Sequence, residues 1–284
     1  PWILETNELY FVNASEDRRA SALAGLLRVH ERWAYRRCDV LVCISQGLAN
    51  LICREVGVSA EKIVVLPNGV DVHRFDPAKT RPKRLFEGPT IGFVGSLQAW
   101  QRLDLLLEAL AALRGEGIRY HLVVVGDGAM KETWEQHAGH LGLAAQVHFV
   151  GYVPWDEVPA YIAGFDLGYA GAVPLAAGSM YLSPLKLYEY AAMGKPFVAA
   201  AYPDAEALVA DGASGYLFTP GDLEDLKRAL RKAFAEQERW TPCGVAARAL
   251  IIENHSWEAR VQQLLGHVKP LIGRDDGAPL SAGY

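Results

Sequence analysis

The 284-residue chain has few cysteines, no excess of positive charge and no long apolar run. Its four cysteines, Cys38, Cys43, Cys53 and Cys243, form no CxxC pair and show no zinc-type spacing, so we interpret them as reduced, mostly buried thiols. The formal net charge of −5 argues against a general nucleic-acid-binding protein, because such proteins are normally basic. No apolar run approaches the roughly 20 residues that span a bilayer, and no signal-peptide pattern is visible. We therefore expect a cytoplasmic protein that binds no nucleic acid.

The composition, with 51% hydrophobic and 21% charged residues, is that of a globular protein with an ample core, and the length predicts about two domains. From residue 90 onward, apolar strand-like runs alternate with amphipathic helical patterns. The runs cover residues 91–95, 121–126, 147–150, 167–170, 196–200 and 216–218, and the helical patterns cover 105–113, 131–140 and 223–235. This alternation predicts an α/β fold with a doubly wound parallel sheet that binds ligands at the carboxyl ends of its strands.

The first 85 residues show the same alternation in shorter form. Strands are predicted at residues 3–5, 39–44 and 63–66, and helices at 16–37 and 47–56. Three strands are few for an independent domain of this kind, and Pro1-Trp2-Ile3 leads directly into a buried-strand pattern. We therefore expect the chain to be a fragment from which preceding sequence is missing. The tail 271–284 is expected to be flexible.

The segment 179–196 is the most informative stretch of the chain. Ser183 and Pro184 predict the N-cap and first position of a short helix, which Gly194 and the following proline would end. Lys186 then lies in the first turn, where the positive end of the helix dipole disfavours a cation unless an anion docks there. Glu189, one turn later, could accept hydrogen bonds from two sugar hydroxyls. The pattern indicates a nucleotide-sugar site, and the alternative is a surface ion pair between these two side chains.

Six motifs in one order resemble glycosyltransferase family 4 and cover most of residues 60–260. They are Pro67-Asn68-Gly69-Val70-Asp71 with Phe75, Gly92-Phe93-Val94-Gly95-Ser96, Gly126-Asp127-Gly128, Phe149-Val150-Gly151-Tyr152-Val153, Ser183-Pro184-Leu185-Lys186-Leu187-Tyr188-Glu189-Tyr190 and Gly212-Ala213-Ser214-Gly215-Tyr216. The resemblance implies a GT-B architecture of two Rossmann-like domains, sugar transfer with retention of anomeric configuration, and no bound metal or other cofactor. The sequence contains no Asp-x-Asp motif, which also disfavours a metal-dependent transferase of the other major fold.

The loop 76–88, which contains prolines, glycines and several charges, is the predicted linker between two domains, and the resemblance implies what each domain does. Residues 1–85 would be the C-terminal part of a truncated acceptor-side domain, and 86–255 the domain that binds the nucleotide sugar, with UDP or GDP as its nucleotide. Residues 256–270 would form a final helix that packs back toward the first domain. The acceptor would be a glycan, a lipid-linked sugar or a small molecule.

The resemblance assigns Glu189 to the ribose and Ser183 to Lys186 to the diphosphate or the sugar. The full set of expected donor-binding residues is Gly95, Ser96, Arg102, Gly151, Tyr152, Val153, Ser183, Pro184, Leu185, Lys186 and Glu189. Lys186 and Arg102 are the expected electrostatic stabilisers of the leaving group.

The chain departs from the family pattern at three positions. Ser96 and Gln101 stand where many relatives have arginine and lysine, and Tyr181 stands where they have glutamate. Arg102 is one residue late for the lysine position, which turns a helical side chain by about 100°. Its alternative role is a solvated ion pair with Asp104.

Other interpretations stay open at this stage. The chain could bind a nucleotide sugar without catalysing transfer, or it could be a sugar-nucleotide epimerase of the same fold. Gly126-Asp127-Gly128 after a strand is a weak dinucleotide-binding pattern, and His137 with His140 indicates a solvated helix face rather than a metal site. The arginine-rich helix Arg18–Arg37 predicts either an ordinary core-facing helix or peripheral contact with anionic lipid at the inner face of the membrane.

Overall fold

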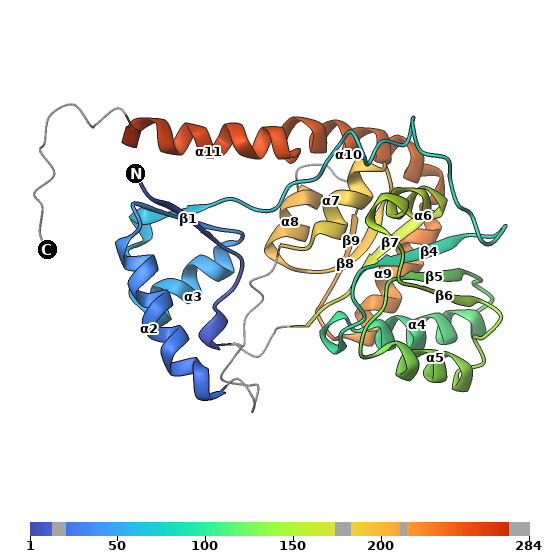
Figure 1. The fold of residues 1–284 in the computed structure, drawn as a ribbon. Helices are drawn as coiled ribbons and strands as arrows, with labels where there is room; N and C mark the ends of the chain where they lie inside the picture. The colour runs from blue at the N-terminus through green and yellow to red at the C-terminus, as the bar shows by residue number, and fades with distance from the viewer. Residues whose placement is uncertain (13–20, 174–182, 211–214, 273–284) are drawn as a thin grey trace, which may run out of the picture. The chain divides into compact units, whose positions relative to one another are not determined.

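The computed structural model describes residues 1–12, 21–173, 183–210 and 215–272 (Figure 1). The strands are β1 (Ile3–Thr6), β2 (Val40–Cys43), β3 (Ile63–Val65), β4 (Thr90–Val94), β5 (His121–Val125), β6 (Val147–Gly151), β7 (Leu167–Ala170), β8 (Phe197–Ala200) and β9 (Gly215–Phe218). The α-helices are α2 (Ser21–Arg37), α3 (Gln46–Val56), α4 (Leu103–Gly115), α5 (Lys131–His140), α6 (Val158–Gly164), α7 (Leu185–Ala192), α8 (Pro203–Ala210), α9 (Leu223–Ala235), α10 (Trp240–Asn254) and α11 (Trp257–Ile272).

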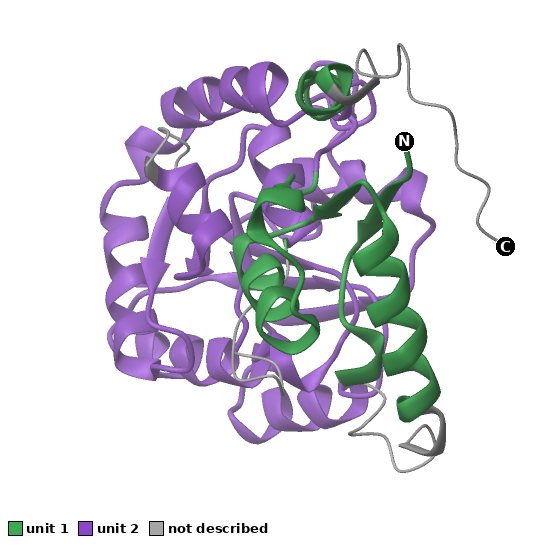
Figure 2. Cartoon of the chain, turned by 90° about the vertical axis from the view of Figure 1, so that its left-hand side faces the viewer, with its two compact units in different colours: residues 1–68, 179–183, 258–284 green, residues 69–178, 184–257 purple. Residues whose placement is uncertain are grey.

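The chain divides into two compact units, which Figure 2 distinguishes by colour. Unit 1 contains residues 1–68, 179–183 and 258–284, and unit 2 contains residues 69–178 and 184–257. The sequence placed the boundary at residue 85, but the segment 69–85 belongs to unit 2. The guanidinium of Arg248 ties the first part of this segment to α10 by donating hydrogen bonds to the carbonyls of Val72 and Phe75. Further along, Lys83 N donates to Ala160 O at 2.8 Å.

Unit 1 contains a parallel sheet in the order β1-β2-β3. Its middle strand, β2, is buried at every position, as an apolar strand between two parallel neighbours should be. The following helix α3 begins where the Ser45 hydroxyl accepts a hydrogen bond from Leu48 N, and it ends at Gly57, whose φ of 74° is left-handed. The three predicted strands of this part are therefore confirmed.

Unit 2 is a doubly wound sheet of six parallel strands in the order β6-β5-β4-β7-β8-β9. Helices α4, α5 and α9 cover one face, and α6, α7, α8 and α10 cover the other (Figure 1). This confirms the predicted fold class. The strand order reverses between β4 and β7, and open α/β sheets bind their ligands at such a switch point, at the carboxyl ends of the strands.

The two strands at the switch point pair only briefly. β4 and β7 are in register at Ile91 with Leu167 and at Gly92 with Gly168, and no pairing is recorded beyond these residues. The buried hydroxyl of Tyr190, on α7, lies where the strands separate. It accepts a hydrogen bond from Val94 N at 3.1 Å and is 3.3 Å from Tyr169 O, so it satisfies backbone groups that no longer pair with each other.

Helix α7 starts one residue later than the sequence predicted. Leu185 is its first residue, Pro184 is the N-cap, and no side chain caps the helix. The predicted N-cap was Ser183, which is wrong because its hydroxyl accepts a hydrogen bond from Asn68 N at 3.0 Å instead. Lys186 is thus the second helical residue and still lies in the first turn. The predicted stop is confirmed, since Gly194, which follows the C-cap residue Met193, has a φ of 65°.

Gly92 in β4 is a position where any side chain should destabilise unit 2. A β-carbon at this residue would lie 1.9 Å from the ring of Phe165, which is itself buried. We expect Gly92→Ala to lower the stability of unit 2 by about 1–3 kcal/mol, because the ring must shift within a packed core. Urea unfolding followed by tryptophan fluorescence measures this change.

Gly139→Ala in α5 is the matched control, since nothing lies within 4 Å of its added β-carbon. It should leave the stability unchanged or raise it by up to about 1 kcal/mol. Equal urea midpoints for the two variants would contradict the close packing of Gly92 against Phe165.

Candidate functional site

A hollow of about 360 Å³ opens at the carboxyl ends of β4, β5 and β6 in unit 2. Its lining residues are Val94, Gly95, Ser96, Val125, Gly126, Asp127, Tyr152, Val153, Trp155 and Val158. Four of the predicted donor-binding residues, Gly95, Ser96, Tyr152 and Val153, therefore meet at one place. They come from loops after different strands, and the parallel sheet brings those loops to the same edge.

The rim of this hollow carries two exposed aromatic side chains. Tyr152 is 78% exposed and Trp155 is 53% exposed, although both rings are largely apolar. The Arg74 guanidinium lies 3.9 Å from the centre of the Trp155 ring, and Phe75 meets the same ring edge-on at 6.3 Å. Flat rings beside an apolar hollow can stack on a planar base. The sequence patterns did not point to Trp155 or Arg74. An aromatic residue two positions after the Gly151-Tyr152-Val153 motif could have indicated Trp155 as part of the site.

The glycines after β4 and β5 are explained by the close approach of the two loops. A β-carbon at Gly126 would lie 2.0 Å from the carbonyl oxygen of Gly95, and both residues have φ values near 135°. Gly95 N donates to Val125 O at 3.0 Å, and Gly126 N donates to Gly151 O at 2.9 Å. Glycine is therefore required for packing. The Gly-Asp-Gly pattern needs no dinucleotide to account for it.

Lys186 is buried beside the end of β4. Its Nζ lies 3.9 Å from the centre of the Phe93 ring and donates a hydrogen bond to Gln101 Oε1 at 2.9 Å. A β-carbon at Gly95 would lie 3.2 Å from the same Nζ, so the amine lies directly against the backbone there. A surface ion pair between Lys186 and Glu189 is therefore not what forms. The lysine is 8% exposed, and its polar partner is an uncharged amide.

Burial shifts the pKa values of both ionisable groups on this helix. Loss of water lowers the pKa of Lys186 to about 7, although the negative charge of Glu189 raises it in part. Loss of water raises the pKa of Glu189 to about 7, and the charge of Lys186 acts in the opposite direction. Burial thus moves the pKa of both groups toward neutrality, and shifts of this kind are typical of functional sites.

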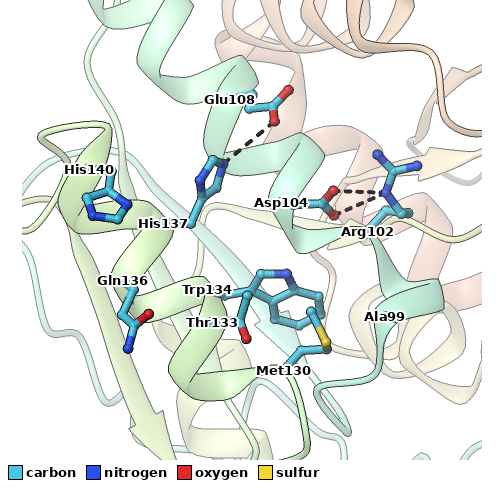
Figure 3. Close-up of a pocket in the computed structure, with 10 residues that line it drawn as sticks. All are labelled: Ala99, Arg102, Asp104, Glu108, Met130, Thr133, Trp134, Gln136, His137 and His140. Carbon is cyan, nitrogen blue, oxygen red and sulfur yellow. Dashed lines mark hydrogen bonds and ion pairs between the residues drawn. The ribbon is translucent and has the colours of Figure 1, made fainter.

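Arg102 lies in different surroundings from Lys186. Its Nε is 3.1 Å from both carboxylate oxygens of Asp104, and the two residues line a second depression, of about 590 Å³, between α4 and α5 (Figure 3). The φ of Arg102 is 50°, the one positive value among the non-glycine residues that the structure describes. Because of this turn, Gln101 rather than Arg102 meets Lys186. The ion pair with Asp104 is the alternative that the sequence left open.

The same depression contains the histidines considered in the sequence. His137 Nε2 faces Glu108 Oε1 at 3.6 Å, while His140 lies further along α5 (Figure 3). Within the described ranges, no group of three or more His, Cys, Asp or Glu side chains could hold a metal ion. In the same ranges, no helix is both long enough and apolar enough to cross a membrane.

The remaining predicted site residues lie around the start of α7. Ser183 belongs to unit 1, where its carbonyl accepts a hydrogen bond from Asn68 Nδ2 at 2.8 Å. Pro184 is half-buried, and the Leu185 side chain is 47% exposed. Tyr181 lies outside the described residues, as do Gly212, Ala213 and Ser214 of the last motif.

The comparisons with known proteins agree on one family of enzymes. Residues 77–250, more than half of the chain, match the family described as glycosyl transferases group 1, and residues 10–74 match glycosyltransferase family 4. The chain is 27% identical over 258 residues to a 2-deoxystreptamine glucosyltransferase from Streptomyces kanamyceticus, covering 88% of this chain and 65% of that protein. It is 30% identical over 250 residues to a GDP-mannose-dependent alpha-(1-6)-phosphatidylinositol monomannoside mannosyltransferase from Mycolicibacterium smegmatis, covering 82% of this chain and 64% of that protein.

Solved structures agree on the fold. Sucrose-phosphate synthase from Thermosynechococcus elongatus superposes with a TM-score of 0.76 at 18% identity, covering 96% of this chain and 68% of that one. Anabaena HepE in complex with UDP and glucose gives a TM-score of 0.70 at 21% identity, covering 95% of this chain and 71% of that one. The chain thus spans just under two thirds of the length of the two curated relatives, 65% and 64%. It has a GT-B fold and belongs to the glycosyl transferases group 1 family.

Proposed function

We propose that this chain forms the donor-binding part of a glycosyltransferase that moves a hexosyl unit from a nucleotide diphosphate sugar to an acceptor. Retention of anomeric configuration and independence from a bound metal or other cofactor are part of the proposal. The observation that carries it is the buried amine of Lys186 against Gly95, at the edge of the sheet that also holds the aromatic-rimmed hollow. Family membership and the nucleotide in the HepE complex support the same assignment.

Each part of the donor has a corresponding group in the proposed site. The base enters the hollow beside Tyr152 and Val153, and Gly151 shapes the loop that holds them. The ribose hydroxyls bind Glu189, which is half-buried on α7. The diphosphate lies between the backbone of Ser96 and the ammonium of Lys186. A positioned cation there would stabilise the negative charge that develops as the nucleotide leaves.

The start of α7 contributes its backbone to the same proposal. Pro184 and Leu185 precede Lys186, and the first N–H groups of a helix have no partner within it. These groups and the helix dipole favour an anion at that end. Ser183, whose hydroxyl is bound to Asn68 N, would contribute through its position in the chain rather than through its side chain.

Arg102 remains the proposed second electrostatic stabiliser. Its observed ion pair with Asp104 opposes this role. Asp104 occupies Nε, and about a third of each side chain is exposed. To reach the diphosphate, the guanidinium would have to leave that carboxylate. Of the two proposed stabilisers, Lys186 is the one whose observed position allows it to supply the positive charge.

Binding of free nucleotides tests the donor site. Lys186→Met and Glu189→Gln should each weaken binding of UDP or GDP about ten- to a hundredfold, because each removes one charge-assisted contact. Titration calorimetry with UDP, GDP and ADP at pH 7 measures the change and identifies the preferred base.

Lys232→Met, at an exposed position on α9, is the control and should bind like the unchanged chain. If neither nucleotide loses affinity in the Lys186 and Glu189 variants, the donor site lies elsewhere. A chain that binds nucleotide but turns over no donor sugar with any acceptor would support the non-catalytic alternative.

We also propose that α2 makes peripheral contact with a membrane at its inner face, next to a lipid-linked or glycan acceptor. Leu26, Val29 and Trp33 are each more than half exposed and lie along one side of the helix at spacings of three and four residues. Trp2 packs on Trp33 with ring centres 5.8 Å apart and is itself 39% exposed, which extends the apolar surface.

Arginines flank this apolar stripe on α2. Arg28, Arg32 and Arg37 carry positive charge beside it, while Arg18 and Arg19 lie outside the described residues. Arg36 is engaged within unit 1, because its Nη2 donates to Val56 O at 2.7 Å. Exposed apolar side chains between basic ones suit an anionic lipid surface, and each arginine near that surface contributes about 1 kcal/mol.

Sedimentation with vesicles tests this contact. The double variant Arg32→Glu with Arg37→Glu should bind phosphatidylserine-containing vesicles at least about thirtyfold more weakly at low salt, because two attractions are lost and two repulsions replace them. The matched control reverses two exposed cations of unit 2, Arg119→Glu with Lys232→Glu, and should sediment like the unchanged chain. If the unchanged chain stays in the supernatant, the lipid contact is wrong.

A further inference from the structure

The amine of Lys186 is buried without a carboxylate in contact. The groups around Nζ are the Phe93 ring and the Gln101 amide, with the backbone of Gly95 alongside. Among the charged groups on the elements around this amine, Glu189 on α7 is the one whose charge shifts the pKa of Lys186. The Glu189 carboxylate makes no ion pair with Lys186 within 4.0 Å. Arg102, which follows Gln101, is bound to Asp104.

Such surroundings favour the neutral amine in the ligand-free protein. Removing an ammonium from water is costly unless an opposite charge replaces the water, and an amide oxygen and a ring face replace it only in part. The position of Lys186 in the first turn of α7 adds to the cost, because the helix dipole is positive there. The lowered pKa of Lys186, about 7, agrees with this geometry.

We infer that binding of a nucleoside diphosphate is coupled to uptake of one proton by Lys186, and that Gln101 is the positioning residue that holds the amine for this step. The inference rests on the proposed function of the site. The proton comes from solvent and adds to the free electron pair on Nζ, and the phosphate oxygens supply the negative charge that the Phe93 ring and the Gln101 amide do not carry. No other bond forms or breaks.

Gln101 suits this role better than the lysine that many relatives have at its position. A second ammonium near Nζ would repel the first, whereas the Gln101 Oε1, at 2.9 Å from Nζ, accepts a hydrogen bond from either form of the amine. With Oε1 occupied by Lys186, the Nε2 group of the same buried amide is left to donate to a phosphate oxygen. The site thereby avoids two adjacent cations and still offers two donors to the ligand.

Calorimetry of UDP and GDP binding tests the inference. Above pH 8, where Glu189 is ionised, the dissociation constant of the unchanged chain should rise about tenfold per pH unit, because the ligand selects the protonated amine. At pH 8, the binding enthalpy in buffers of different ionisation enthalpy should report uptake of nearly one proton. Lys186→Arg, which is always charged, should show no uptake and a nearly constant affinity between pH 8 and 9.

A ligand-free measurement keeps this test separate from the proposed function. The Lys186 amine can be titrated in the free chain by NMR of its ¹³C-labelled ε-carbon. Its midpoint should lie near neutral pH, and Gln101→Glu, of the same shape, should raise it by placing a carboxylate beside Nζ. An unchanged midpoint in Gln101→Glu would show that the side chain at position 101 does not contact the amine, which contradicts the positioning role.

Each outcome has one meaning. A Lys186 midpoint near the ordinary lysine value, or nucleotide binding with no proton uptake at pH 8, overturns the inference and leaves the donor site intact. Uptake that persists in Lys186→Arg also overturns it, since another group would then carry the proton. A midpoint near neutral pH with no binding of either nucleotide overturns the proposed function, and the coupling with it.

Discussion

The separation of β4 from β7, bridged by the hydroxyl of Tyr190, is the constraint on which the site depends. Parallel strands that part must satisfy their backbone groups in another way, and this hydroxyl does so for Val94 N. Tyr190 thereby ties α7 to the end of β4. Lys186 lies one turn earlier on the same helix, so the contact that completes the sheet also brings the amine against Gly95.

The buried amine is a local cost that the rest of unit 2 must offset. Whether the amine stays charged or loses its proton, burial beside only an amide and a ring face costs stability relative to an apolar side chain of the same size. A buried ionisable group without an opposite charge is typical of functional sites, where a bound ligand supplies that charge. The glycines of the neighbouring loops follow the same logic, because they leave space for backbone atoms and for Lys186 where a side chain would collide.

Much of the fold could be predicted from the sequence because its signals are local. The bounds predicted for α5, β7 and α9 match the structure at both ends. For α9, apolar residues at helical spacing follow Asp222, whose carboxylate accepts a hydrogen bond from Asp225 N. The start of α7 was misplaced because Asn68, 115 residues away in the chain, binds the Ser183 hydroxyl. The domain boundary was misplaced because Arg248 binds the carbonyls of Val72 and Phe75 and Ala160 O accepts from Lys83 N, all within unit 2. No local pattern reveals partners at such distances.

The sequence by itself determined the order of strands and helices, the doubly wound sheet and the motif that carries Lys186 and Glu189. Hydrophobic period and turn residues encode these features over a few positions. The tertiary structure alone decided which neighbour Lys186 has. Gln101 and Arg102 are consecutive, and the left-handed turn at Arg102 directs one to the amine and the other to Asp104. That choice depends on a backbone conformation rare for a non-glycine residue and on a contact across 85 positions of the chain, and neither follows from local propensity.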